Sequence, residues 1–158
     1  MPANGIIHLS DASLIAIHAL VGLADAEGRL VQGRDLAAII DASENHLAKV
    51  MQRLVRASIV RSVKGPNGGF ALDKRPEDIS FKEAIEAVDG PISSGFCPFR
   101  TDRCNPNNCI FGKEISKHAF ELVAYLSQRT VADIARERAP DSPPAYHAVI
   151  GNRTKRGA

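Results

Sequence analysis

The stretch Arg34–Leu72, RDLAAIIDASENHLAKVMQRLVRASIVRSVKGPNGGFAL, decides the fold, because two helical patterns and a hairpin pattern follow one another in it without interruption. Its first part, residues 34–40, places Leu36, Ile39 and Ile40 on one helical face. The turn residues 41–43 come next. Ser43 is suited to cap a following helix, because a serine hydroxyl accepts a hydrogen bond from a free backbone N–H of the first turn.

A second helix is predicted from Glu44 to about Ala57. Its apolar residues recur at the i, i+3, i+4, i+7 spacing of one buried stripe, which consists of Leu47, Val50, Met51 and Leu54. The opposite face is polar and carries Glu44, Asn45, His46, Lys49, Arg53 and Arg56. Hydrogen-bonding and cationic side chains on one helix face are suited to base edges and phosphates of DNA.

A β-hairpin is predicted directly after this helix. Residues 59–64 alternate and are rich in β-branched side chains, residues 65–69 are dense in turn formers, and Phe70–Leu72 resumes a strand. Asn67-Gly68 is the strongest turn signal, because asparagine and glycine accept the positive φ of a tight hairpin turn. Two short helices joined by a three-residue turn and followed by a basic hairpin predict a winged helix-turn-helix. The predicted fold class is mainly α with a small β-hairpin wing.

The charge distribution favours DNA binding by this unit. Residues 34–64 contain six lysines and arginines against three acidic residues, whereas the net charge of the whole chain is only +2. The positive field is therefore local, as a phosphate-contacting surface requires. The alternative is a small helical domain whose polar face is merely solvated.

The flanking segments add further helices. Ser10 is predicted to cap a helix that runs to about Ala24, with Leu14, Ile17, His18 and Val21 facing inward and His18 packed rather than serving as a ligand. The pattern Ser80-Phe81-Lys82-Glu83 is a capping box that opens a short helix to about Val88, and Asp89-Gly90-Pro91 ends it.

A long amphipathic helix is predicted over residues 113–128, with one apolar face that consists of Ile115, Ala119, Leu122, Val123 and Leu126. Because little core remains for it to cover, we interpret it as a dimerisation helix, with burial against its own domain as the alternative. The predicted organisation is a DNA-binding domain at 1–80, a linking helix and cysteine loop at 81–112, the dimerisation helix and a short C-terminal helix at 113–138, and a disordered tail at 139–158.

The three cysteines of the chain, Cys97, Cys104 and Cys109, lie in a segment without periodicity. Soft thiolates suit an iron–sulfur cluster, zinc or copper(I). Zinc fits poorly, because a structural zinc site closes with four ligands, often in close cysteine pairs, and the loop offers neither such a pair nor a histidine. An iron–sulfur cluster can take a fourth, non-cysteine ligand from elsewhere. Three unligated thiols remain the alternative.

The chain resembles the Rrf (type two) family of winged-helix regulators, in particular its IscR-like and NsrR-like members, from about Leu9 to Ala135. The resemblance rests on Asn45-His46-Leu47 with Lys49, on Val63–Phe70, on Ala87–Gly90 and on the three cysteines. It implies a homodimeric transcription factor whose recognition helix enters the major groove, whose wing enters the minor groove, and whose cluster state alters DNA affinity. Carried over by position, the DNA contacts are Ser43, Asn45, His46, Lys49 and Lys64, to which the polar helix face adds Arg53.

The fourth cluster ligand departs from the family patterns. Some members use a histidine three residues after the third cysteine, where this chain has Gly112. Others use an aspartate early in the partner's first helix, and the matching position here is Ser13. The nearby candidates are Asp11 and His8, although Asp11 also suits the helix dipole. We favour a [2Fe–2S] over a [4Fe–4S] cluster.

Composition excludes several functional classes. The longest apolar run, residues 14–24, is about half the ~20 residues needed to cross a bilayer, and no basic residue precedes Arg29 as a secretory signal requires. We therefore expect a cytoplasmic protein that does not engage a membrane. No paired carboxylates, nucleophile with a matched base, or phosphate-binding glycine loop indicates an enzyme. The predicted function is a homodimeric repressor that binds a double-stranded DNA operator and senses redox, nitric oxide or iron–sulfur status. The alternative is a cluster-free regulator controlled by a partner protein or by thiol oxidation.

Overall fold

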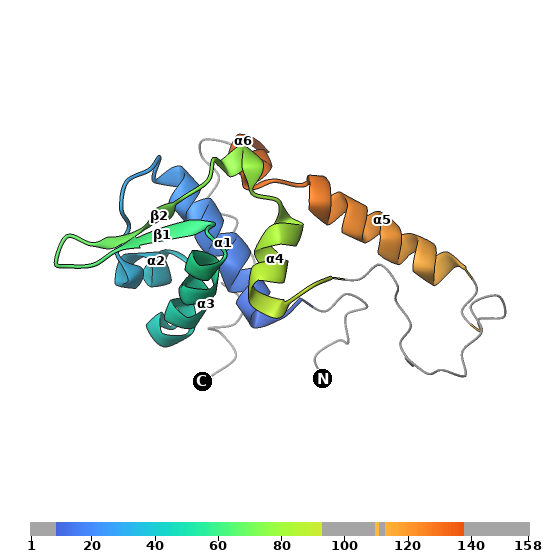
Figure 1. Cartoon of the computed structure of the whole chain (residues 1–158), viewed down its shortest axis with the longest axis horizontal. Helices are drawn as coiled ribbons and strands as arrows, with labels where there is room; N and C mark the ends of the chain where they lie inside the picture. Colours follow the sequence, from blue (N-terminus) through green and yellow to red (C-terminus); the bar gives the residue numbers. More distant parts are fainter. Residues whose placement is uncertain (1–8, 93–109, 111–112, 138–158) are drawn as a thin grey trace, which may run out of the picture.

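The computed structural model describes residues 9–92, 110 and 113–137. In chain order the elements are α1 (Asp11–Asp25), α2 (Gly33–Ile39), α3 (Glu44–Arg56), β1 (Val60–Val63), β2 (Gly69–Leu72), the 3-10 helix η1 (Pro76–Asp78), α4 (Phe81–Asp89), α5 (Glu114–Gln128) and α6 (Val131–Glu137). Helices α1 to α4 and α6 pack together around one core, and α5 projects from them on the side opposite the hairpin (Figure 1). The fold is mainly helical with one two-stranded antiparallel sheet, which confirms the predicted fold class.

Helix α1 lies at the centre of the domain, in contact with α2, α3, α4 and α6. It begins at the predicted cap, where the Ser10 hydroxyl accepts from the Ser13 N–H at 3.0 Å. The predicted inner stripe is partly wrong, because Leu14 is 41% exposed. The buried positions are instead mostly alanine and leucine, namely Ser13, Ala16, Ala19, Leu20, Val21 and Leu23. Small side chains allow four helices to approach one central helix closely.

Helices α2 and α3 form the predicted helix-turn-helix. The α3 stripe is confirmed, because Leu47, Val50, Met51 and Leu54 are all buried. The expected inner face of α2 is correct for Leu36 and Ile40 but wrong for Ile39, which is 44% exposed. Ala37 is buried in its place, because the short helix turns its Leu36–Ala37 edge toward the core.

The hairpin forms the wing. Strands β1 and β2 pair in antiparallel register from Val60 opposite Leu72 to Val63 opposite Gly69. At the turn, a side chain on Gly68 would place its Cβ 2.1 Å from the Val63 carbonyl oxygen, so only glycine fits there. Val31 joins the sheet by an isolated bridge to Phe70, which attaches the base of the wing to the segment before α2.

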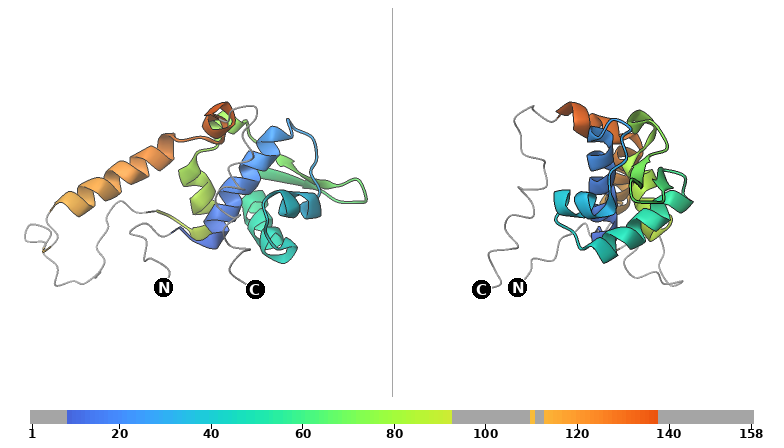
Figure 2. Two further views of the ribbon diagram at one scale, coloured as in Figure 1. Left: turned by 180° about the vertical axis from the view of Figure 1, so that it is seen from behind. Right: turned by 90° about the vertical axis from the view of Figure 1, so that its left-hand side faces the viewer.

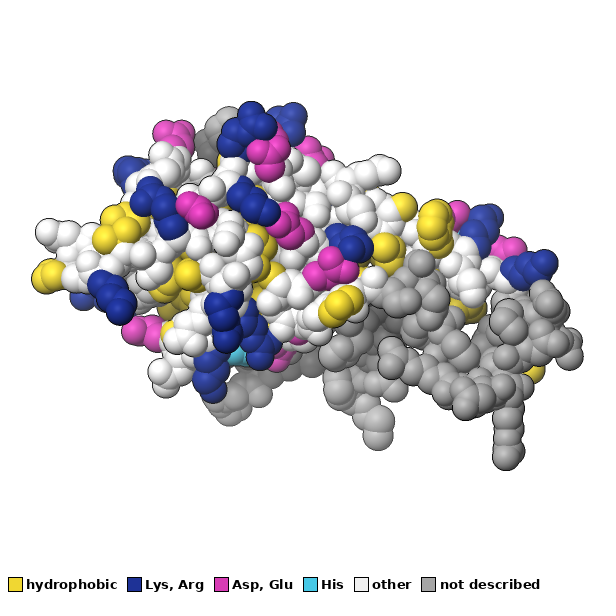
Figure 3. Space-filling view, viewed as in Figure 1, with side chains coloured by type: hydrophobic (Ala, Val, Ile, Leu, Met, Phe, Trp, Pro, Cys, Tyr) yellow, Lys and Arg dark blue, Asp and Glu magenta, His cyan; other side chains and the backbone are white. Residues whose placement is uncertain are grey.

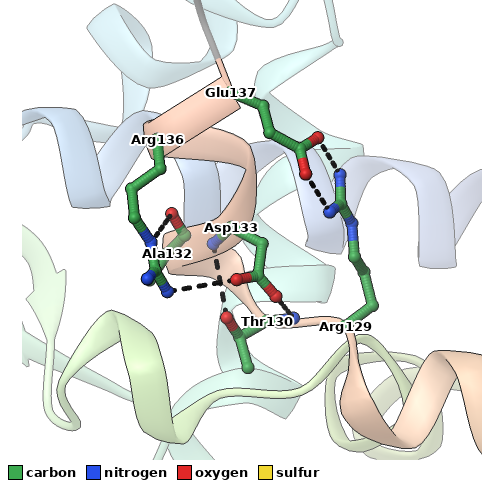
Figure 4. Close-up of polar contacts among 6 residues, drawn as sticks. All are labelled: Arg129, Thr130, Ala132, Asp133, Arg136 and Glu137. Atoms are coloured by element: carbon green, nitrogen blue, oxygen red, sulfur yellow. Dashed lines mark hydrogen bonds and ion pairs between the residues drawn. The ribbon is translucent and has the colours of Figure 1, made fainter.

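Helix α6 folds back onto α1 and fixes the end of α5. The Phe81 N–H donates to the Arg129 carbonyl at 2.8 Å, and the Val131 N–H donates to the Ile79 carbonyl at 3.0 Å. Thr130 caps α6 in reciprocal contact with Asp133, and Arg129 donates to both carboxylate oxygens of Glu137 (Figure 4). The connection between α5 and α6 is therefore attached to the body of the domain.

Helix α5 is covered over only part of its length. Leu126, near its C-terminal end, is 9% exposed, whereas Phe120 is 65% exposed and Ile115 is also exposed. Figure 2 shows the helix standing away from the body of the domain, with only its C-terminal end close to it. Within the described part of the chain, no helix is long and apolar enough to cross a membrane.

Candidate nucleic-acid interface

The polar face of α3 is the best-formed candidate surface. Ser43 ends the preceding turn, and its hydroxyl accepts from the His46 N–H at 3.2 Å, so the first turn of α3 is capped as predicted. Asn45 and Lys49 are exposed and His46 is half-buried. Because the apolar stripe fastens α3 to the core, these polar groups stand on a rigid helix and face away from the domain.

Several cations lie together on and beside this face of α3. Lys and Arg side chains gather over α3 and beside it, with a histidine among them (Figure 3). Lys49, Arg53 and Arg56 are exposed on α3, and Arg61 and Lys64 are exposed on the wing. The arrangement places positive charge on the helix and on the hairpin next to it, as contact with two stretches of phosphate backbone requires.

The wing tip is joined to the start of α2. Gln32, at the cap position of α2, donates from Nε2 to the Pro66 carbonyl oxygen at 3.2 Å. Gly68 N–H donates to the Gly65 carbonyl at 2.9 Å within the turn. These contacts hold the exposed Lys64 at the base of a closed turn rather than on a free loop.

Arg53 is engaged within the protein. One terminal nitrogen of its guanidinium donates to the Val88 carbonyl in the last turn of α4. The polar-face pattern could not indicate this contact, because Val88 lies 35 residues further along the chain.

The predicted fourth-ligand region lies at the start of α1. The hydroxyls of Ser10 and Ser13 both donate to one carboxylate oxygen of Asp89, each at 2.6 Å. Ser13 is fully buried and therefore committed to this contact, whereas Asp11 is exposed in the first turn. From the sequence, Asp89 was predicted only to end a helix. The signal that sequence reasoning missed is the pair of serines at the start of α1, Ser10 and Ser13.

The predicted cluster ligands Cys97, Cys104 and Cys109 lie outside the described residues, as does His8. Among residues 9–92, 110 and 113–137, no group of three or more histidine, cysteine, aspartate and glutamate side chains is arranged to hold a metal ion. His18 is half-buried on α1, and burial lowers its pKa below the usual histidine value. This is the behaviour of a packed histidine.

Comparison with known proteins agrees with this architecture. A family model described as "Rrf2: Iron-dependent Transcriptional regulator" matches residues 9–137. A protein of Aquifex aeolicus (strain VF5) named "Putative HTH-type transcriptional regulator" is 30% identical over 128 residues, which cover 79% of this chain and 89% of the relative. The BadM regulator of Rhodopseudomonas palustris is 35% identical over 79 residues, which cover 50% of this chain and 51% of that protein.

Two solved structures share the fold. CymR, described as the global cysteine regulator of B. subtilis, superposes with a TM-score of 0.72 at 22% identity, covering 85% of this chain and all of that one. T. potens IscR superposes with a TM-score of 0.64 at 23% identity, covering 84% and 88%. The family match spans the helix-turn-helix, the wing and α4 to α6, and the chain therefore belongs to the Rrf2 family of transcriptional regulators, which are not enzymes.

Proposed function

We propose that this regulator is a homodimeric repressor that binds a double-stranded DNA operator and responds to redox, nitric oxide or iron–sulfur status. The observation that carries the DNA-binding part is the exposed polar face of α3 beside a basic wing. In this proposal Ser43, Asn45, His46 and Lys49 meet the major groove, where base edges carry a distinct pattern of donors and acceptors. Lys64 meets the adjacent backbone or minor groove from the wing.

The dimeric part of the proposal rests on α5. One recognition helix covers half of a two-fold operator, so a second copy is needed to cover the whole. The uncovered apolar side chains of α5, Ile115 and Phe120, support this helix as the contact between copies. Its C-terminal end is fixed to the domain through Arg129 and Thr130, so that a contact along α5 would set the distance between the two copies of α3.

The sensing part rests on the chemistry of the three cysteines. Cys97, Cys104 and Cys109 offer three soft thiolates, a donor set that fits an iron–sulfur cluster, preferably [2Fe–2S]. Such a cluster, when bound, supplies iron that reacts with nitric oxide or oxygen. The buried Ser13 already serves Asp89, which leaves the exposed Asp11, or His8, as the candidate for the fourth ligand.

A second candidate function is a cluster-free regulator controlled by a partner protein or by thiol oxidation. The hydrogen bond from Ser13 to Asp89 favours it, because the residue that matches the family's aspartate ligand is already engaged. Gly112, which matches the family's histidine ligand, has no side chain that could bind iron. In this case the cysteine thiols would either be oxidised themselves or have no role in regulation.

Anaerobic purification separates the two functions. A cluster-containing protein shows visible absorbance with iron and acid-labile sulfide, and the absorbance bleaches in air. Operator duplexes selected from a random pool then measure binding of the iron-loaded protein, the air-exposed protein and a Cys97→Ser/Cys104→Ser/Cys109→Ser variant. Equal operator affinity of all three forms would reject cluster sensing. A colourless, iron-free protein whose affinity changes with a thiol oxidant would support the second function.

A further inference from the structure

Two consecutive residues at the end of α4 hold two other helices. Val88 accepts a hydrogen bond from Arg53 of α3, and Asp89 accepts two from Ser10 and Ser13 at the start of α1. The recognition helix and the central helix are thus fastened to the same turn of α4.

Both contacts are favoured by the electrostatics of helix ends. The Arg53 guanidinium lies at the C-terminal, partly negative end of α4, and the Asp89 carboxylate lies at the N-terminal, partly positive end of α1. Each hydrogen bond is charge-assisted, which makes it stronger than one between neutral groups. The Ser13 hydroxyl is fully buried, so water cannot replace the carboxylate there.

The residues that follow this turn, up to Ile92, are also attached to α4. Gly90 has a φ of 89°, a conformation that favours glycine, and the Ile92 N–H donates to a carboxylate oxygen of Glu86 at 2.9 Å. Glu86 is held in turn by Lys82 at 2.6 Å. The next residue, Ser93, opens the segment that carries the three cysteines. Ile92, the residue before that segment, is therefore attached to α4 itself.

We propose that Arg53 is a positioning residue of the recognition helix, not a phosphate contact, and that the last turn of α4 transmits the state of the cysteine segment to α3 through it. The transmission rests on the proposed sensing function, whereas the positioning role of Arg53 does not. A displacement of the chain at Ile92 shifts the last turn of α4. Because Arg53 donates to the Val88 carbonyl of that turn, the shift also displaces α3.

The salt dependence of operator binding tests the role of Arg53. A side chain that neutralises a phosphate contributes about 0.9 to the slope of log affinity against log salt concentration. Arg53→Gln is expected to weaken operator binding at least tenfold with an unchanged slope, and Arg53→Lys, which keeps one cationic donor, to recover part of the loss. Lys64→Gln is the control and should lower the slope by about one phosphate. A slope lowered to the same extent in Arg53→Gln would overturn the positioning role.

The ratio of operator affinities between the iron-loaded protein and its cysteine triple variant tests the transmission. In the Arg53→Gln background this ratio is expected to fall toward one. In the Ser13→Ala background, which removes one of the two hydrogen bonds that hold Asp89, the ratio should fall in the same direction. Circular dichroism and thermal unfolding verify that both variants are folded. An undiminished ratio in folded Arg53→Gln protein would overturn the transmission. A ratio of one in the otherwise wild-type protein would instead reject cluster sensing, and the transmission with it, while the salt slopes still decide the role of Arg53.

Discussion

The buried hydroxyl of Ser13 lies 2.6 Å from the carboxylate of Asp89, 76 residues away in the chain, and donates to it. The contact joins the first turn of the central helix to the last residue of α4. The Ser10 hydroxyl donates to the same oxygen, so one carboxylate holds both serines at the N-terminal end of α1.

Removal of the Asp89 carboxylate is expected to destabilise the fold. Asp89→Ala leaves the Ser13 hydroxyl buried without its acceptor, which costs about 1–3 kcal/mol of unfolding free energy. Ser13→Ala removes the buried hydroxyl itself and leaves only the Asp89 carboxylate without a donor, so it should cost less, because that carboxylate is exposed and can be hydrated. Urea unfolding of both variants measures the difference; equal stability of Asp89→Ala and the wild type would contradict the assignment.

The helix and the wing are expected to contribute differently to DNA binding. Asn45→Ala, His46→Ala or Lys49→Ala should cost about 1–3 kcal/mol at particular base pairs if these side chains contact base edges. Lys64→Ala should weaken binding on all sequences and lower the salt slope. Titrations against operator and random duplexes compare the two effects. Equal losses on both duplexes for the helix variants would mean that α3 contacts only the backbone.

Charged substitutions on the uncovered part of α5 are expected to yield monomers. Leu122 and Leu126 are natural choices from the sequence pattern, but Leu126 is buried in its own chain, so its replacement would also damage the fold. Ile115→Glu with Phe120→Glu avoids this problem, because both side chains are exposed. Gln128→Glu, an exposed position on the same helix, is the control for added charge. Sedimentation measures the mass; a dimer in the double variant would exclude this surface as the interface.

The stability of the fold is expected to fall on mild acidification because of His18. Burial lowers its pKa in the folded state below about 6.5, the value for an unfolded chain, so the unfolded state takes up the proton first. The stabilising effect is complete above about pH 6.5 and is lost as the pH falls through the lower, folded-state pKa. Thermal midpoints between pH 8 and 5 should therefore decline less in His18→Gln, whose side chain does not titrate. Parallel curves for the two proteins would contradict the prediction.

The parts of the fold that local patterns determine were predicted from the sequence. The α3 stripe, the Ser43 and Ser80 caps and the hairpin turn depend on residues a few positions apart, and all are present. The errors occurred where alanine fills a crowded interior. Periodicity favoured Leu14 and Ile39, but close helix packing selected smaller neighbours for burial.

The candidate site was predictable to the extent that it lies on one helix and one hairpin. Arg53 belongs to the polar face of α3 by its spacing, yet its partner is a backbone carbonyl of α4, which no side-chain pattern encodes. Asp89 follows a helix and precedes a glycine, so its local role as a helix end concealed its contact with α1. Long-range pairing of polar groups depends on the packing of whole helices and becomes visible only in three dimensions.

Helix α5 is attached to its domain at one end only, so a small rotation at that end moves the other end over a longer distance. Its 15 residues span roughly 22 Å at 1.5 Å per residue, and the fixed end is the one beside Thr130. A rotation of about 10° about the attached end would move the other end by roughly 4 Å, which is slightly more than the 3.4 Å rise of one base pair. In the proposed dimer, a small change of angle where α5 meets α4 would shift the two recognition helices by about one base pair of operator length, so that the elasticity of this hinge sets the tolerance for half-site spacing.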